Sequence, residues 1–458
     1  MKVLFASSEI FPYAKTGGLA DVANSLPQTL KDKIDIVSVM PFYGFMNIDN
    51  FTKTDINFTI NLGGINYNIS ILSSINQGLL TYFIKAPLLS DTNNPYGDGG
   101  AYANNDMRFG IFSAAIVKLA EALHVELVHL NDWHCALSSF WLKDSKIKTV
   151  FTIHNLAYQG IFEKETLARL GIDEKHFNMN DLEFYGKCNF MKAGIRYCDA
   201  ITTVSPSYAK EILTPKFGCG LDGYLNFYKK KLSGILNGID RKIFDPKTDK
   251  NIFKNFDTES LDKKLENKKE LFEKIKLRDI RPPLFVMISR LVQQKGFDII
   301  IESINPLLKK RLNLLMLVEG DARYQTSLYE ISKKYKNFEL LTGYDEKLSH
   351  QLYASADFLL MPSIFEPCGL NQMIAMRYGT IPIVHNVGGL KDSVHEKSKK
   401  CGKGIVFSKP TKKSFLLAID RALKLKNGQD IRKFNMNCDF SFEKSAKKYM
   451  KLYAEILS

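Results

Sequence analysis

The stretch "KVLFASSEIFPYAKTGGLADVANSL", residues 2–26, contains the unit of structure that the rest of the chain repeats. It opens with an apolar run, 3–6, that predicts a buried strand, and it closes with apolar residues at helical spacing. Lys15 and the pair Gly17-Gly18 stand between them. Glycines let backbone N–H groups approach an anion, and the N-terminus of the next helix favours negative charge. The stretch predicts either a phosphate-binding turn, to which Lys15 adds a charge, or a tight turn beside a surface lysine.

Strand and helix patterns alternate in this way along the whole chain. Stretches 107–124 and 297–310 show the helical spacing best. Such alternation predicts an α/β protein with parallel sheets covered by helices, and two sets of strands predict two doubly wound domains. The strands are predicted at 2–7, 34–40, 79–85, 126–131, 147–154, 200–204 and 232–236, and then at 284–289, 313–319, 338–342, 357–362, 380–385 and 404–407.

Two segments interrupt the alternation. Segment 51–85 places three strand-like runs close together, with Gly63-Gly64 between two of them, which predicts an antiparallel hairpin insertion. The polar stretch 244–251, "FDPKTDKN", follows Asn237-Gly238-Ile239-Asp240 and has the composition of a connection between domains. We therefore expect a first domain over residues 1–240 and a second over 241–440.

The composition is that of a soluble globular protein, with 45% hydrophobic and 24% charged residues among 458. No apolar run approaches the roughly 18 residues that span a bilayer, and the first apolar run is too short for a signal peptide. The seven cysteines are dispersed singly. These features predict a cytoplasmic protein with reduced thiols and no membrane contact.

The net charge of +14 raises the question of a nucleic-acid partner. Nucleic-acid binders usually concentrate basic residues with aromatic or glycine residues between them, whereas lysine is distributed along this chain. The densest stretch, 247–281, has eleven basic and eight acidic residues. We interpret the excess as a solvated lysine-rich surface and predict no nucleic-acid partner, with binding of another polyanion as the alternative.

Charged motifs follow two strands of the second half. Arg290 ends the strand predicted at 284–289, and Lys295 follows it within "SRLVQQKG". A planar guanidinium and an ammonium at one strand end suit a diphosphate, although a solvated loop pair is the simpler interpretation. Glu366 stands in "FEPCGL" after the apolar run 358–362, where a carboxylate can bind sugar hydroxyls or stabilise positive charge, or can merely cap a helix. Cys368 beside it is either reactive or a small packing residue.

Polar residues also end two strands of the first half. His154 follows "KTVFTI", and Asp132-Trp133-His134 follows the strand before it. A metal site built from His129, Asp132, His134 and His154 is disfavoured, because their spacing does not place them on one helix face and no HExxH motif or cysteine set supports it. Neither a GxSxG motif nor a GxxxxGK[ST] motif occurs. The two halves together favour transfer of a sugar from a nucleoside diphosphate.

At this point the motifs are recognisable as a set. "KTGGLADV", "DWH", "HNLAYQG", "NGID", "SRLVQQKG", "FEPCGLNQ" and "VGGLKDSV" occur in order. The chain resembles the bacterial glycogen synthase and plant starch synthase family over nearly its whole length. The resemblance implies the GT-B fold, in which two Rossmann-like domains face a cleft and a last helix, here within 441–458, crosses back to the first domain. It also implies transfer of glucose from ADP-glucose to an α-1,4-glucan such as glycogen, with retention of configuration and without metal or cofactor.

The resemblance assigns roles to residues at matching positions. Arg290 and Lys295 look like the diphosphate clamp, Glu366 like the carboxylate near the anomeric carbon, and His154 like a glucose contact. Lys15 and Gly18 look like donor contacts, and Tyr344 like the ring stacked on adenine. The expected neighbours of sugar and phosphate are Asp21, Asp132, Asn237, Cys368, Gly369 and Leu370, and Tyr96 and Trp133 are expected to help bind the acceptor.

Three positions depart from the family pattern and bear on selectivity. Asn371 replaces a usual threonine, Asn131 replaces a usual histidine, and Val387 replaces a threonine. A synthase of the same fold that uses UDP-glucose or a small acceptor therefore remains an alternative, and a non-catalytic glucan-binding protein is the alternative from another class. A phosphorylase would need a lysine that holds pyridoxal phosphate, and none is identifiable.

Overall fold

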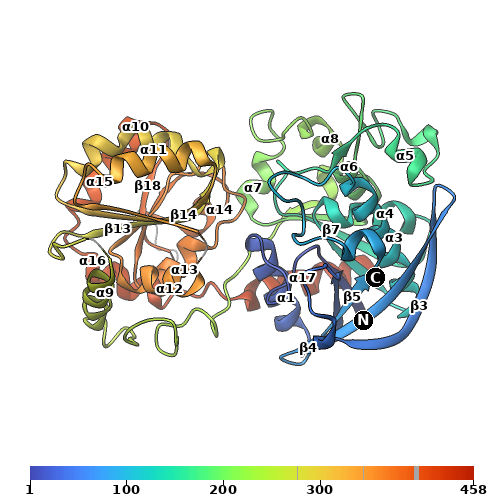
Figure 1. Ribbon diagram of the computed structural model, residues 1–458, viewed down its shortest axis with the longest axis horizontal. Coiled ribbons are helices and arrows are strands. Elements are labelled where there is room, and N and C mark those ends of the chain that lie inside the picture. Colours follow the sequence, from blue (N-terminus) through green and yellow to red (C-terminus); the bar gives the residue numbers. More distant parts are fainter. Residues whose placement is uncertain (276, 344, 397–401) are drawn as a thin grey trace. The chain divides into compact units, whose positions relative to one another are not determined.

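The computed structural model describes residues 1–275, 277–343, 345–396 and 402–458 (Figure 1). Its contacts divide the chain into two compact units. Unit 1 comprises Met1–Ile235 together with Phe442–Ser458, and unit 2 comprises Leu236–Ser441. The division falls before residues 237–240 rather than after them, because the Ile239 N–H donates to the carbonyl oxygen of Phe440 at 2.8 Å within unit 2.

Unit 1 is built on a nine-stranded sheet in the order β12-β11-β7-β6-β1-β2-β5-β4-β3. Strands β12 to β5 of this order are parallel, and β4 and β3 are antiparallel additions at one edge. The strands are β1 (Lys2–Ala6), β2 (Asp35–Pro41), β3 (Thr52–Leu62), β4 (Ile65–Asn76), β5 (Leu79–Lys85), β6 (Leu127–Asn131), β7 (Lys148–Ile153), β11 (Ala200–Thr203) and β12 (Leu232–Gly234).

The β3–β4 hairpin turns at Gly63-Gly64, both of which have positive φ. A Cβ at Gly63 would also stand 2.5 Å from the carbonyl oxygen of Arg169, so this turn requires glycine on two counts. A separate small sheet, in the order β8-β10-β9, consists of β8 (Ile161–Phe162), β9 (Glu183–Phe184) and β10 (Lys187–Asn189).

Helices pack against the large sheet of unit 1, and the last of them comes from the other end of the chain. Helix α17 contributes Phe442, Ala446, Tyr449 and Tyr453 to the same buried cluster as Phe5 of β1. The Tyr453 hydroxyl lies 2.6 Å from Nδ1 of His129. The helices are α1 (Gly18–Leu30), α2 (Pro87–Ser90), α3 (Asn105–Ala122), α4 (Trp133–Leu142), α5 (Thr166–Arg169), α6 (Phe190–Tyr197), α7 (Pro206–Glu211), α8 (Asp222–Phe227) and α17 (Phe442–Leu457).

Unit 2 has a six-stranded parallel sheet in the doubly wound order β15-β14-β13-β16-β17-β18. Its strands are β13 (Leu284–Leu291), β14 (Asn313–Gly320), β15 (Phe338–Thr342), β16 (Phe358–Met361), β17 (Ile381–His385) and β18 (Ile405–Phe407). Its helices are α9 (Lys263–Lys274), α10 (Phe297–Leu308), α11 (Ala322–Ser332), α12 (Glu346–Ser355), α13 (Asn371–Arg377), α14 (Gly388–Ser393), α15 (Lys412–Leu423) and α16 (Gly428–Met436).

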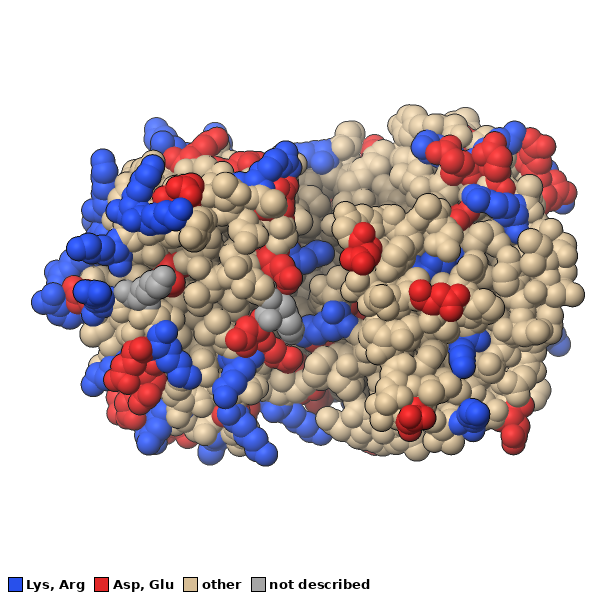
Figure 2. Space-filling model, in the orientation of Figure 1, with Lys and Arg blue, Asp and Glu red and all other residues tan. Residues whose placement is uncertain are grey.

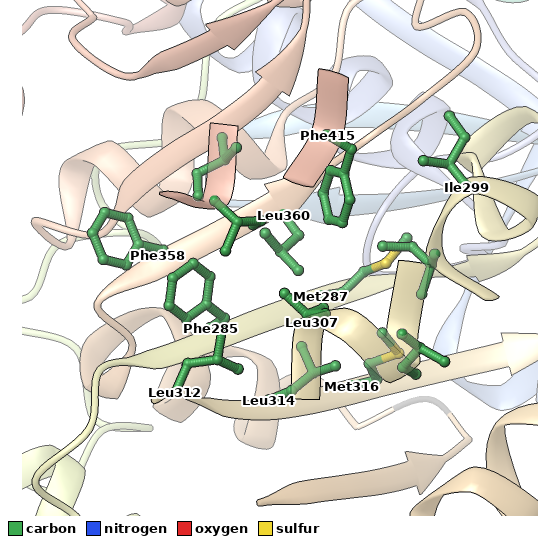
Figure 3. Close-up of a cluster of buried hydrophobic side chains, with 14 of the residues drawn as sticks. Phe285, Met287, Ile299, Leu307, Leu312, Leu314, Met316, Phe358, Leu360 and Phe415 are labelled. Carbon is green, nitrogen blue, oxygen red and sulfur yellow. The ribbon is translucent and has the colours of Figure 1, made fainter. Parts of the chain in front are cut away.

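The core of unit 2 lies between its sheet and the helices on one face. Figure 3 shows Phe285 and Met287 of β13 packed with Phe358 and Leu360 of the adjacent β16, with Phe415 of α15 over them. The four strand side chains come from continuous apolar runs, which are typical of parallel strands that are buried on both faces. The core fixes the strands whose ends carry the motifs described below.

The excess positive charge is concentrated in one unit. Unit 1 contains 26 Lys and Arg against 24 Asp and Glu, whereas unit 2 contains 37 against 25, so unit 2 carries a net +12 of the +14. Figure 2 shows Lys and Arg side chains spread over the left part of one face, where Figure 1 draws the elements of unit 2. Within the described residues, no helix is both long and apolar enough to cross a membrane.

Candidate active site

In an open parallel sheet, ligands bind beyond the carboxyl ends of the strands, where the strand order reverses. The order reverses between β1 and β6 in unit 1 and between β13 and β16 in unit 2. Most of the motifs singled out in the sequence follow these four strands. The unit 1 half-site is the group Glu9, Lys15, Tyr96, Asn131, Asp132 and His154, and the unit 2 half-site is the group Asn237, Arg290, Lys295, Glu366 and Cys368.

Glu9 is the centre of the first part of the unit 1 half-site. Its side chain is 4% exposed, and Oε2 accepts a hydrogen bond from the Gly17 N–H at 3.2 Å and another from the Thr16 N–H. Oε1 accepts from the Tyr96 hydroxyl at 2.7 Å, which also lies 2.8 Å from Oγ of Ser8. The carboxylate therefore binds the N–H groups that lead into α1 and fixes Tyr96 over the same turn.

Lys15 lies beside this turn and pairs with Asp21 of α1, with 2.8 Å between Nζ and Oδ1. Both side chains are partly exposed. A Cβ at Gly17 would meet no atom within 4 Å, so the packing of the described residues does not account for a glycine there. The open space above Gly17 is where a bound ligand could approach the backbone.

Asp132 and His154 form the second part of the unit 1 half-site. Asp132 follows β6 with a φ of 57°, an unusual backbone conformation for a residue other than glycine. Its Oδ1 accepts from the His154 N–H at 2.8 Å. Burial raises the pKa of Asp132 to about 7, against the opposing effect of the backbone N–H groups of His154 and Asn155. Burial also lowers the pKa of His154 to about 3, so the imidazole is neutral.

The Asp132 carboxyl predicts a pH dependence of stability. Its folded-state pKa of about 7 lies above the ordinary 3.8, so the folded chain holds this proton more tightly than the unfolded chain does. The stability that protonation provides is therefore lost as the pH rises from about 4 to about 7. Asp132→Asn keeps an oxygen for the two N–H groups but cannot ionise, so it should remove this part of the pH dependence.

Urea unfolding of the wild type and Asp132→Asn across this pH range measures the effect. The free energy difference between the two proteins should change with pH in the sense that favours Asp132→Asn at the alkaline end. A difference that is the same at every pH would show that Asp132 does not titrate there.

Trp133 has a packing role in the structure. Only 8% of it is exposed, and its ring lies 4.9 Å from that of Phe109. A Cβ at Gly160 would stand 2.3 Å from the indole, so glycine is needed there. Tyr96, by contrast, is partly exposed and stacks on His134 at 4.7 Å. Of the two aromatic residues expected near the acceptor, Tyr96 is the one with accessible surface.

In unit 2, Lys295 and Glu366 form an ion pair across the switch point. The Lys295 ammonium donates to Oε2 of Glu366 at 2.7 Å and to Oε1 at 2.9 Å, and Oε2 also accepts from the Ser363 hydroxyl at 2.9 Å. Glu366 is 4% exposed. An ammonium has three donors, and two are used here. The third is left for an anion that approaches the β13 and β16 ends.

Arg290 is the penultimate residue of β13, and its side chain is exposed. Its side chain forms no hydrogen bond or ion pair with the residues that the structure describes. A cation of this kind, five residues before Lys295 and at the same strand end, is available to a ligand. Asn371, which replaces the threonine of the family pattern, donates from Nδ2 to the carbonyl oxygen of Ile288 at 2.8 Å and so ties α13 to β13.

The turn after Glu366 is held by close backbone contacts. A Cβ at Gly389 would stand 2.1 Å from the Cys368 carbonyl oxygen, and the Gly389 N–H donates to the Glu366 carbonyl oxygen at 2.9 Å. Gly369 has a φ of 70°, and Leu370 precedes α13. Burial raises the pKa of Cys368 to about 12, so this thiol is an unreactive packing group. Asn237, which lies in unit 2, has its Oδ1 buried without a hydrogen-bond partner among the described residues.

Two further predictions from the sequence concern Tyr344 and a metal site. Tyr344 lies outside the described residues. Within the described parts of the chain, no three His, Cys, Asp or Glu side chains are grouped so that they could hold a metal ion.

Comparisons with known proteins agree with the motif order. A family model described as "Starch synthase catalytic domain" matches residues 2–227, and one described as "Glycosyl transferases group 1" matches residues 268–437. The chain is 44% identical over 469 residues to "Glycogen synthase" of Aquifex aeolicus, a match that covers 100% of both proteins. It is 38% identical to "Glycogen synthase" of Thermodesulfovibrio yellowstonii, with 100% of this chain and 98% of that protein covered.

A solved structure supports the same relationship. The catalytic domain of starch synthase IV from Arabidopsis thaliana, bound to ADP and acarbose, superposes with a TM-score of 0.92 at 32% identity and covers 100% of this chain. Sucrose-phosphate synthase from Thermosynechococcus elongatus superposes with a TM-score of 0.64 at 15% identity, which indicates a shared fold alone.

Proposed function

The chain belongs to the starch and glycogen synthase family of retaining GT-B glycosyltransferases, and we propose that it transfers glucose from ADP-glucose to the non-reducing end of an α-1,4-glucan such as glycogen. The observation that carries the proposal is the Lys295–Glu366 pair at the unit 2 switch point. It offers a spare ammonium donor to a diphosphate and a carboxylate to a sugar within one turn. The solved relative that binds ADP supports adenine as the base.

The proposed reaction uses one face of the sugar. The bond from C1 of glucose to the β-phosphate oxygen breaks, and the 4-hydroxyl oxygen of the glucan end bonds to C1 on the same face. The departing phosphate oxygen takes the hydroxyl proton, so that ADP leaves. Arg290 and Lys295 stabilise the charge that grows on the diphosphate, and Glu366 faces the positive charge near C1.

Residues of unit 1 have proposed contacts of their own with the donor and the acceptor. His154 contacts the glucose, while Lys15 and Gly18 contact the donor. Tyr96 helps to bind the acceptor. The proposed neighbours of sugar and phosphate are Asp21, Asp132, Asn237, Cys368, Gly369 and Leu370, and Tyr344 is proposed to stack on the adenine.

Initial rates of ADP and UDP release from the two glucose donors, each with and without glycogen, test the proposal. We expect ADP release that requires glycogen and exceeds UDP release by about tenfold or more. Equal or UDP-favoured release would keep the fold and the chemistry but change the donor. No release from either donor, with retained binding of glycogen, would make the chain a glucan-binding protein.

The charge of unit 2 predicts that donor capture depends on salt. The diphosphate is an anion, and the net +12 of unit 2 raises its local concentration. We expect kcat/KM for the donor to fall several-fold between about 0.02 and 0.2 M salt, because screening shortens the reach of the field. The KM for glycogen, which is uncharged, is the internal control. Equal salt sensitivity of both parameters would point to a general effect of salt on the protein.

A further inference from the structure

Asn131 is buried between the two strands that define the unit 1 switch point. It is the last residue of β6 and is 1% exposed. Its Nδ2 donates to the Ala6 carbonyl oxygen, the last of β1, at 2.8 Å. Its Oδ1 lies 2.9 Å from Nε2 of His154. The amide thus connects the end of β1 to a side chain of the half-site.

These two contacts determine the protonation of His154. A carbonyl oxygen can only accept, so the NH₂ group of Asn131 must face Ala6 and the amide oxygen must face His154. The amide oxygen can also only accept, so Nε2 of His154 must carry the proton. A neutral imidazole with its proton on Nε2 has a lone pair on Nδ1. Among the described residues, Nδ1 has no hydrogen-bond partner.

We propose that Asn131 is a positioning residue that holds His154 in the Nε2–H tautomer, so that Nδ1 is presented as a hydrogen-bond acceptor to a hydroxyl group of the bound sugar. The identity of the ligand rests on the proposed function, whereas the tautomer rests on the contacts of Asn131 alone. An amide suits this task because it cannot titrate and its two ends are chemically different. A histidine at the same position could serve either tautomer of its neighbour.

The other titratable groups near His154 leave this assignment intact. The Asp132 carboxyl binds the backbone N–H of His154 rather than its ring. His129 and His134 lie within electrostatic range, and burial lowers the pKa of each well below neutrality. Both are therefore neutral, and the Asn131 oxygen is the group that meets the ring proton.

Nuclear magnetic resonance tests the tautomer directly in the full-length protein. Long-range proton–nitrogen spectra of protein labelled with ¹⁵N-histidine distinguish the two neutral tautomers from the imidazolium, and His154→Gln assigns the signals. We expect His154 as the Nε2–H tautomer near neutral pH, with or without ligand. A proton on Nδ1, or a charged ring, would overturn the proposal. This measurement needs no turnover, so it stands even if the proposed activity fails.

Asn131→Asp tests the consequence for catalysis. A carboxylate beside the ring stabilises the imidazolium and raises the pKa of His154, and an imidazolium cannot accept at Nδ1. We expect kcat/KM for the nucleotide sugar to acquire an additional acidic limb, with a loss of about tenfold at its low-pH end and recovery as the pH rises. We expect the wild type to lack the limb that belongs to His154, and any titration of Asp132 is common to both proteins. A uniform loss at all pH values would mean that Asn131 has a structural role only.

Asn435→Asp is the matched control. Asn435 is also 1% exposed and its Nδ2 also donates to a backbone carbonyl, that of Lys403, at 2.8 Å, but it lies in unit 2 and forms no hydrogen bond with a histidine among the described residues. It receives the same isosteric change and should keep the wild-type pH profile. An additional limb in this control would overturn the assignment to His154. Where Asn131→Asp does not fold, the tautomer in the wild type decides.

Discussion

Lys295→Ala is expected to remove about 2–5 kcal/mol of transition-state stabilisation, which is a loss of roughly 30-fold to 5,000-fold in kcat/KM. Two effects add. The ammonium no longer meets the charge that develops on the diphosphate, and among the described residues the buried Glu366 carboxylate keeps the Ser363 hydroxyl alone as a side-chain partner. The loss should appear mainly in kcat, because the charge on the leaving group grows in the transition state.

Steady-state kinetics with saturating glycogen measure the effect, and Lys310→Ala provides the control. Lys310 pairs with Asp420 at 2.6 Å in the same unit, but it follows α10, away from the β13 and β16 ends. That pair is partly exposed and should contribute about 0–1 kcal/mol to stability and nothing to turnover. Unchanged kcat in Lys295→Ala, or an equal loss in Lys310→Ala, would contradict a role for Lys295 in the reaction.

Lys264→Met is expected to destabilise unit 2 by about 3–5 kcal/mol. Lys264 of α9 is 7% exposed, and its Nζ lies 2.9 Å from the carbonyl oxygens of Tyr353, Ala354 and Tyr378 and 2.8 Å from the Thr380 hydroxyl, so these four acceptors share its N–H donors. Burial lowers its pKa well below the usual value. Methionine fills the space but removes the ammonium donors from these buried oxygens, of which the Tyr353 carbonyl keeps the Thr380 hydroxyl.

Amide hydrogen exchange in β16 and β17 is the suitable measurement, because both tryptophans of the chain, Trp133 and Trp141, lie in unit 1 and report on the other half. Lys269→Met is the control: it makes the same change on the exposed face of α9 and should stay within about 0.5 kcal/mol of the wild type. Equal opening free energies in the two variants would mean that the buried ammonium contributes nothing to stability.

The parallel strands of the two large sheets could be predicted from the sequence, because each one is a short apolar run that is buried in the fold. The run ending at Ser289, for example, is β13, which continues to Leu291 because Arg290 and Leu291 still pair with β14. The strands of the small sheet, β8 to β10, have two or three residues and too little pattern to be recognised. The three-residue helix at Gln293–Lys295, which positions Lys295, is also too short to be recognised.

The hydrogen-bond partners of a side chain could be predicted only where both residues lie close in the sequence, at the end of the same strand. Glu9 follows β1, as His154 follows β7, so the strand-end rule could have found it, but its partners at 16, 17 and 96 come from two segments that lie far apart in the sequence. The solvated surface predicted for 247–281 is wrong for Lys264 and Lys268, both of which are buried. Their oxygen partners lie up to 116 residues away, and no local pattern encodes that distance.

Unit 1 is assembled from both ends of the chain, and this sets the order in which the protein can be completed during translation. Residues 236–441 leave the ribosome before Phe442 does, so unit 2 has its entire sequence available while unit 1 still lacks α17. Until then the surfaces around Phe5 and His129 that receive Tyr449 and Tyr453 are uncovered. Until α17 is made, the N-terminal part of unit 1 therefore exposes apolar side chains that are buried in the finished protein. We expect a chaperone to bind the chain at this stage.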